Sequence, residues 1–244
     1  MTQTATPFRR FRPTLWFTVF AVFGVAALLA LGTWQVQRLT WKNDLIARLE
    51  VRLAAPPEPL PARIDDPAAW EYRRASVAGR FLHDKEMLIA GRTWQGQAGW
   101  HVVTPLVRDD GAGAVLVNRG FVPHDRRDPA LRREGQVADS VTVEGLVRPG
   151  GRQSWMQPGN RPGENTWFWY DIPAMAAHAG LKEAPPVVLE AGPAANPGGL
   201  PIGGQTVVRI RNDHLTYALT WYSLAVALGV IWFFYHWRRR PTGG

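Results

Sequence analysis

One stretch decides the fold of this chain: residues 212–225, which read NDHLTYALTWYSLA. The polar Asn-Asp-His triplet comes directly before an apolar run that continues to Trp237 without Asp, Glu, Lys or Arg. At about 1.5 Å per residue, a helix of this length is long enough to cross a bilayer. We therefore expect a soluble segment to become a membrane helix at His214, with a transmembrane helix over residues 214–237.

A second apolar run lies near the N-terminus. Residues 14–33, TLWFTVFAVFGVAALLALGT, contain no charge over twenty residues, which matches a bilayer core of about 30 Å. The run is longer than the apolar part of a typical signal peptide and continues without a turn into helix-favouring sequence, so we expect an uncleaved anchor. The head, residues 1–13, is too short for a mitochondrial transit peptide, which favours a bacterial inner membrane.

Arginines flank both apolar runs on the side of the chain ends. Three stand in the head, and three follow Trp237 directly. By the positive-inside rule, both termini are then cytoplasmic, including the tail, residues 238–244, and residues 34–213 lie on the periplasmic (outer) face. The sequence predicts a protein that crosses the membrane twice.

Small residues predict that the two membrane helices pack on each other. Gly24 and Gly32 share one face of the first helix, and Ala225 and Gly229 share one face of the second. Small side chains let helix backbones approach closely in a membrane. We expect these four positions to lie at the contact between the helices.

Between the two apolar runs, the sequence is typical of a β-rich domain. Short β-favouring runs alternate with Gly, Pro and Asp turns, and the candidate strands are residues 72–81, 86–90, 100–107, 114–120, 140–147, 167–170, 187–190 and 205–211. One helix is expected after Asp171, with Pro173 in its first turn and Gly180 as its stop. We predict an α+β membrane protein, in which two transmembrane helices flank one mainly antiparallel β domain, a small barrel or sandwich with one or two helices.

Composition and motifs exclude several classes of function. The chain has no cysteine, which rules out disulfides, thiolate metal sites and covalent c-type haem attachment. The net charge of +8 would suit nucleic acid, but the arginines are dispersed and no RNA- or DNA-binding signature accompanies them, so we expect no nucleic-acid partner. The sequence also lacks GxSxG, HExxH, P-loop and GxGxxG patterns, and we expect no enzyme.

His214 is a candidate metal-ligating residue. On a helix, His214, Tyr217 and Trp221 follow steps of three and four residues and share one face. An imidazole at a membrane surface, above an aromatic stripe, could ligate a flat hydrophobic cofactor such as haem. It could also be an ordinary interfacial residue, and the spacing alone leaves both interpretations open.

Two further patterns have an ordinary structural interpretation. Trp34, Arg38 and Trp41 recur at i, i+4 and i+7 after the first apolar run, as in an aromatic belt with a snorkelling arginine. Arg119 and Gly120 end a strongly β-favouring run, where glycine would serve backbone geometry. Neither pattern indicates chemistry by itself.

Three motifs, taken together and in order, resemble one family. They are GTWQxxRxxWK at residues 32–42, NRGFVP at residues 118–123 and NDHLxYAxTWY at residues 212–222. This pattern resembles the surfeit locus protein 1 family, the cytochrome c oxidase assembly factors with two membrane helices around one outer domain. The resemblance covers nearly the whole chain, from about Arg12 to Arg239.

The resemblance implies a part in building the haem a centres of haem–copper oxidases. Bacterial members of the family are thought to bind haem a and pass it on, and the proposed axial ligand of the iron is the histidine that matches His214. Haem a is then a transiently bound cargo. The implied partners are cytochrome c oxidase subunit I, haem A synthase and the lipid bilayer.

Five other residues would complete such a site. Tyr217 and Trp221 would pack on the haem or hydrogen-bond its polar groups. Trp34, Arg38 and Trp41 would lie at the same membrane level, and we hypothesise that Arg38 pairs with a propionate. The alternative function is a scaffold that holds oxidase assembly intermediates through the outer domain without binding haem.

Overall fold

The structure is a computed structural model that describes residues 10–238, except residues 12, 207 and 209. The chain divides into two compact units. One unit comprises residues 1–48 and 209–244, and the other comprises residues 49–208. The first unit contains the apolar helices and the second contains the β domain, with helix α1 running from one unit into the other.

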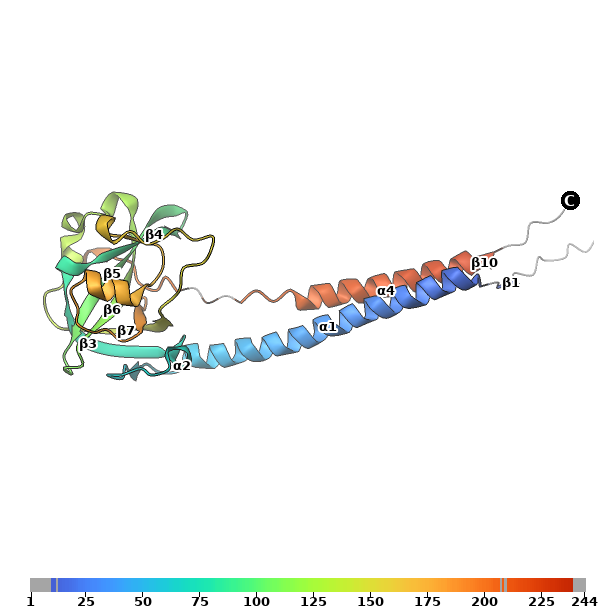
Figure 1. The fold of residues 1–244 in the computed structure, drawn as a ribbon, viewed down its shortest axis with the longest axis horizontal. Coiled ribbons are helices and arrows are strands. Elements are labelled where there is room, and N and C mark those ends of the chain that lie inside the picture. The colour runs from blue at the N-terminus through green and yellow to red at the C-terminus, as the bar shows by residue number, and fades with distance from the viewer. Residues whose placement is uncertain (1–9, 12, 207, 209, 239–244) are drawn as a thin grey trace, which may run out of the picture. The chain divides into compact units, whose positions relative to one another are not determined.

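Two helices are long and apolar enough to cross a membrane, as the sequence predicts: α1 (Leu15–Ala54) and α4 (His214–His236). In Figure 1, α4 lies alongside the N-terminal part of α1. Helix α1 has 40 residues, about 60 Å, so it extends well past the apolar run. It ends at Ala54, two residues before Pro56, because a proline disfavours the helical conformation of the residue that precedes it. Strand β1 (Arg10–Phe11) pairs with strand β10 (Trp237–Arg238) in the antiparallel direction, through two residue pairs.

Glycines of α1 lie against large side chains of α4, which confirms the predicted packing on the α1 side. A Cβ atom at Gly32 would lie 2.7 Å from Cε1 of Tyr222. A Cβ atom at Gly24 would lie 2.8 Å from Cδ2 of Leu228. Both distances are too short for a real side chain, so glycine at these positions sets how closely the two helices approach.

On the α4 side, the prediction is half right. Ala225 is buried, as expected, together with Ala218 two turns earlier. A Cβ atom at Gly229 would meet nothing within 4 Å, so the expectation that Gly229 lies at the contact is wrong. At that level it is the neighbouring Leu228 that fills the space against Gly24.

The second unit is built on one curled sheet with the strand order β2-β3-β7-β9-β6-β5-β4-β8. The strands are β2 (Glu58–Pro59), β3 (Arg74–Phe81), β4 (Met87–Trp94), β5 (Gln97–Arg108), β6 (Ala114–Pro123), β7 (Val141–Pro149), β8 (Thr166–Trp167) and β9 (Val187–Ala191). Five pairings are antiparallel, and the pairs β2–β3, β4–β8 and β6–β9 are parallel. The sheet is therefore mainly antiparallel, as predicted.

The sheet curls back on itself without becoming a closed barrel. Residues 79–81 of β3 pair with residues 106–108 of β5, in addition to the pairing of β3 with β7. The approach is close at Gly79, where a Cβ atom would lie 2.1 Å from the carbonyl oxygen of Val107. Because the extra pairing covers three residue pairs, the expected barrel or sandwich is a partly closed mixed sheet.

Apolar side chains cover both faces of the sheet because successive strand residues point to opposite faces. In β6, Val115 and Val117 belong to one core cluster, and Leu116 belongs to the other. Helix α3 (Ile172–His178) packs on the second cluster through Ile172 and Met175. The remaining helical elements are α2 (Pro67–Trp70) and the 3₁₀ turns η1 (His83–Lys85), η2 (His124–Arg126), η3 (Pro129–Gly135), η4 (Pro162–Glu164) and η5 (Pro197–Gly199).

Helix α3 confirms the turn chemistry expected for it. The side chain of Asp171 caps the helix by accepting a hydrogen bond from the backbone N–H of Ala174. Pro173 stands in the first turn, and Gly180 follows the helix with φ +70°, a conformation that glycine adopts without strain.

Two predicted strands are wrong in whole or in part. Strand β8 ends at Trp167, so the predicted strand over residues 167–170 does not continue. There the backbone N–H groups of Phe168 and Trp169 donate to the side-chain oxygen of Asn160 instead of a strand. In the predicted strand 205–211, the described residues form no strand, and residues 207 and 209 lie outside the described part of the chain.

Candidate functional site

The start of α4 is tied to α1 by one short hydrogen bond. His214 is the first residue of α4, and its Nδ1 lies 2.6 Å from Oε1 of Gln35. Gln35 is 9 % exposed, although it stands in an apolar helix. Because an amide oxygen can only accept, Nδ1 of His214 donates, and in a neutral ring Nε2 then carries the lone pair in the ring plane.

Contacts on both sides of His214 fix the register of the two helices. Nδ2 of Asn212 donates to Oδ1 of Asn43 at 2.8 Å. Further along, the hydroxyl groups of Thr33 and Tyr222 lie 3.2 Å apart. The bond between Gln35 and His214 thus lies between two other polar contacts of the same helix pair.

The three residues predicted on α1 form a cluster of their own. The guanidinium carbon of Arg38 lies 5.8 Å from the ring centroid of Trp34 and 5.6 Å from that of Trp41. Both indoles are exposed, and these distances suit cation–π attraction. The cluster therefore presents one arginine between two aromatic rings on the surface of α1.

Helix geometry places this cluster on one flank of the helix pair. Each residue turns an α-helix by about 100°, and Gln35 marks the direction that faces α4. Trp34, Arg38 and Trp41 lie roughly 60–120° to one side of that direction. Thr33 is displaced to the opposite side.

The aromatic residues of α4 lie on the same flank. The buried Ala218 and Ala225 mark the face that α4 turns to α1. Tyr217 and Trp221 are rotated from this face by roughly 50–90° in one direction, and Tyr222 by roughly 50° in the other. Because Tyr222 meets Thr33, Tyr217 and Trp221 lie on the side of the pair that carries the Arg38 cluster.

The structure thus brings the six residues predicted from the sequence to one end and one flank of the helix pair. His214 lies at the contact with α1, between the two aromatic stripes. Sequence reasoning missed Gln35, although it stands inside the motif at residues 32–42. The available signal was an amide in a stretch that must be buried against another helix, where a polar side chain needs a partner.

In the β domain, the motif at residues 118–123 has a structural role. Arg119 is 2 % exposed, and its Nη2 donates to the carbonyl oxygen of Gly135 and, at 3.3 Å, to Oδ1 of Asn196. Its guanidinium carbon lies 4.7 Å from the ring centroid of Phe81. Burial lowers the pKa of Arg119 to about 10, and the side chain remains a cation that holds two loops on the sheet.

Gly120 serves backbone geometry, as the sequence predicts. It has φ +118°, and a Cβ atom there would lie 1.9 Å from the carbonyl oxygen of Ile202. Phe121 and Ile202 exchange backbone hydrogen bonds of 2.9 and 2.8 Å directly beside it. Only glycine allows the chain at Ile202 to come this close to β6.

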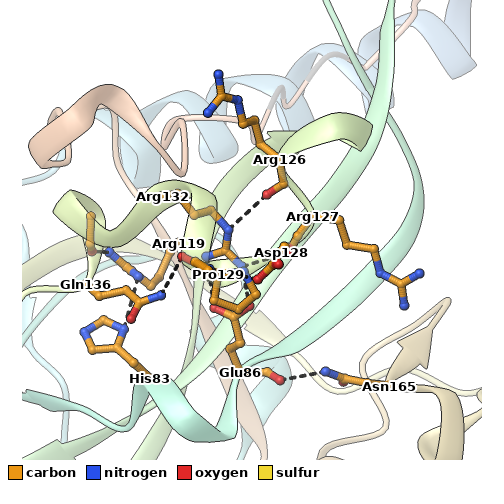
Figure 2. Close-up of polar contacts among 12 residues, drawn as sticks. His83, Glu86, Arg119, Arg126, Arg127, Asp128, Pro129, Arg132, Gln136 and Asn165 are labelled. Carbon is orange, nitrogen blue, oxygen red and sulfur yellow. Dashed lines mark hydrogen bonds and ion pairs between the residues drawn. The ribbon is translucent and has the colours of Figure 1, made fainter.

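A buried ion pair lies near Arg119. Both Nη atoms of Arg132 donate to the carboxylate of Glu86, and both side chains are almost completely buried. Figure 2 shows the pair with its neighbours, including Asn165, whose Nδ2 donates to the backbone oxygen of Glu86 at 2.9 Å. The pair ties η3 to the start of β4, and no pattern in the sequence indicated it.

The histidines of the β domain have partners of their own. His83 and His124 line one open hollow of about 830 Å³, together with Asp84 and Asp125. Nε2 of His83 donates to the carbonyl oxygen of Val137 at 2.9 Å, and Nδ1 of His124 accepts from Nε1 of Trp100 at 3.2 Å. No three His, Asp or Glu residues are grouped to hold a metal ion in the described part of the chain.

His101 belongs to a separate, buried polar network. Its Nδ1 lies 3.1 Å from Nδ2 of Asn118, which also donates to the hydroxyl oxygen of Tyr170 at 2.7 Å. The hydroxyl of Tyr170 in turn donates to Glu190 at 2.8 Å. Burial, and to a smaller extent the charge of Arg92, lowers the pKa of His101 to about 4. The ring is therefore neutral at physiological pH.

The fold and the group of residues around His214 together define a class of protein. It is the class of membrane proteins that have two apolar helices around an extramembrane β domain. A family model described as the SURF1 family matches residues 22–226. The chain is 43 % identical over 215 residues to the SURF1-like protein of Monosiga brevicollis, covering 84 % of this chain and 81 % of the relative.

Two mammalian relatives agree with the family match. The surfeit locus protein 1 of Mus musculus is 42 % identical over 230 residues, covering 88 % of this chain and 74 % of the relative. For the surfeit locus protein 1 of Homo sapiens, the identity is 40 % over 218 residues, with coverages of 83 % and 72 %. The chain belongs to the SURF1 family, which is known for cytochrome c oxidase assembly factors.

Proposed function

We propose that this chain binds haem a at the outer face of a bacterial inner membrane and assists its delivery to subunit I of haem–copper cytochrome c oxidase. One observation carries the proposal: the hydrogen bond from Nδ1 of His214 to Gln35. It leaves Nε2 of a neutral imidazole to serve as axial ligand of the haem iron. The family to which the chain belongs supports the same cellular role.

The residues around His214 fit the chemistry of a haem. A haem offers a flat apolar macrocycle and two carboxylates, so a site for it needs aromatic surface and a cation. Tyr217 and Trp221 on α4, and Trp34 and Trp41 on α1, supply aromatic rings on one flank. Arg38 lies between the two α1 indoles, where its guanidinium can pair with a propionate.

The proposed role is that of a carrier and not of an enzyme. A carrier must release its cargo, and a single histidine ligand on a partly exposed flank suits release better than a closed cage with two ligands. The partners are then subunit I, which receives the haem, and haem A synthase, which supplies it. Both termini are cytoplasmic in this proposal, so His214 lies at the outer surface of the bilayer.

The spectrum of the purified protein tests the proposal. The full-length chain, co-expressed with a haem A synthase, is expected to copurify with haem a and to show its absorption bands. His214→Ala should lose these bands. His236→Ala is the matched control, because His236 lies at the other end of α4, about 33 Å away along the helix axis, and the bands should remain.

A different result would favour the scaffold function. If the wild-type chain is colourless under these conditions and still supports oxidase assembly in cells, haem binding is wrong. The β domain would then be the part that holds assembly intermediates. Equal spectra of the wild type and His214→Ala would instead remove His214 from the site.

A further inference from the structure

We infer that Gln35 is the positioning residue of this site: its amide oxygen fixes the tautomer and the ring orientation of His214. This inference rests on the proposed function, because it concerns how His214 is prepared for the haem iron. Gln35 does not touch the cargo in this arrangement. It acts through the imidazole.

The geometry makes the bond selective for one tautomer. A neutral imidazole carries its proton on either Nδ1 or Nε2, and an acceptor at one nitrogen decides between them. Oε1 of Gln35 lies 2.6 Å from Nδ1, so the Nδ1–H tautomer is stabilised. Metal-ligating histidines commonly donate their second ring N–H in this way, and the donor bond sets the orientation of the ring.

The bond is built into the helix pair. Gln35 lies on the α1 face that turns to α4, one turn after Gly32, which touches Tyr222. The amide is buried, and leaving a buried polar group without a hydrogen-bond partner carries a cost in free energy. Together with the contact of Asn43 and Asn212, this cost holds the imidazole and the amide against each other before any cargo arrives.

An amide has a different effect on the histidine from that of a carboxylate. A carboxylate at this place would pull the Nδ1 proton and make Nε2 a stronger donor to the metal. The neutral Oε1 of Gln35 orients the ring with less of this effect. Gln35 therefore orients His214 toward the haem iron and still allows the haem to be released.

The tautomer can be measured without haem. Nitrogen NMR of full-length protein with ¹⁵N-labelled histidine, in lipid nanodiscs at about pH 8, where imidazole is ordinarily neutral, separates Nδ1–H from Nε2–H rings. His214→Ala identifies the signals of His214. The wild type should carry its proton on Nδ1, and Gln35→Leu should shift His214 to a mixture or to Nε2–H. Gln37→Leu, on the exposed side of the same helix, should leave the signals unchanged.

Haem binding supplies the second measurement. Gln35→Leu should lower haem a affinity roughly 10–100-fold, the usual effect of losing such a partner, with a changed absorption spectrum. Gln35→Glu should retain haem binding. It should transfer haem more slowly than the wild type to apomyoglobin, which serves as an unrelated haem acceptor. Full affinity and wild-type spectrum in Gln35→Leu would overturn the inference.

The two proposals fail in different ways. A proton on Nε2 of His214 in the wild type, or the same tautomer in Gln35→Leu, overturns the role of Gln35 even if haem binds. A colourless wild type whose His214 carries the proton on Nδ1 overturns the proposed function and leaves the structural part of the inference standing.

Discussion

Arg132 and Glu86 form a two-point ion pair in which the side chains are 1 % and 6 % exposed. The partners are 46 residues apart in the sequence. In Figure 2, the pair lies in a group with Arg119, Arg126 and Arg127. Arg126 and Arg127 accept hydrogen bonds from Arg132 through their backbone oxygens, and their side chains point away from the pair. The carboxylate of Glu86 is therefore the counter-charge of the buried guanidinium of Arg132.

Removing that charge should destabilise the β domain. Glu86→Gln leaves Arg132 buried without its counter-ion, which costs about 3–5 kcal/mol. Chemical denaturation of the full-length protein in detergent measures the loss in the free energy of unfolding. Glu164→Gln breaks the exposed pair with Arg161 and should cost less than about 1 kcal/mol. Equal effects of the two substitutions would contradict the importance of burial.

Gly120→Ala should also destabilise the domain. The added Cβ atom would collide with the backbone oxygen of Ile202 at 1.9 Å, and φ +118° is strained for alanine. We expect a loss of more than about 2 kcal/mol. Gly163→Ala is the control, because a Cβ atom there meets nothing within 4 Å. A stable Gly120→Ala protein would show that the segment at Ile202 can move away at little cost.

His101 should make the stability of the domain depend on pH. Its pKa is lowered to about 4 in the folded state, while an unfolded chain has the ordinary value of about 6.5. Below pH 6.5 the unfolded state therefore binds a proton that the folded state does not bind. The contribution of the neutral ring to stability is complete above that pH and falls by about 1.4 kcal/mol per pH unit towards pH 4.

Comparison with His101→Gln isolates this effect. Between pH 7 and pH 5 the wild type should lose roughly 2 kcal/mol more than the variant. The burial of His83 also lowers its pKa, and His83 remains in both proteins, so its contribution cancels. Parallel stability curves for the two proteins would mean that His101 takes up its proton without opposing the fold.

Arg38 should contribute to haem a affinity by its charge and its shape. Arg38→Ala should weaken binding about 5–20-fold, since it removes a charged hydrogen-bond donor at an exposed position. Arg38→Lys should recover part of the loss because it keeps the charge without the two-point geometry. Titration of apo-protein with haem a measures both. Arg48→Ala, on an exposed position of α1 further from Gln35, should bind as the wild type does, and unchanged affinity in both Arg38 variants would remove the propionate hypothesis.

The elements that the sequence predicted well are those in which short-range chemistry determines the structure. Charge-free length marks the two apolar helices, and Asp171, Pro173 and Gly180 mark α3 from cap to stop. A continuous β-favouring run marks β6, because its residues pack on both faces of a sheet. Such signals lie within a few residues of the structure that they predict.

The features that could not be predicted depend on partners far away in the sequence. Glu86 and Arg132 look like ordinary surface charges until the fold buries them together. Asn160 replaces the strand pairing of residues 168 and 169 from a loop. Gln35 is one polar residue of a helix until His214 lies beside it. The six proposed haem-binding residues come from motifs and spacing, and their function stays a prediction.

The bond between Gln35 and His214 joins residues 179 positions apart. Ribosomes make α1 before the β domain and α4 after it. A nascent or truncated chain that has inserted only α1 therefore has the Arg38 cluster but neither the imidazole nor the tautomer that Gln35 selects. In the proposed function, the capacity to accept haem would arise only when both helices are present, so that fragments with α1 alone would not capture haem.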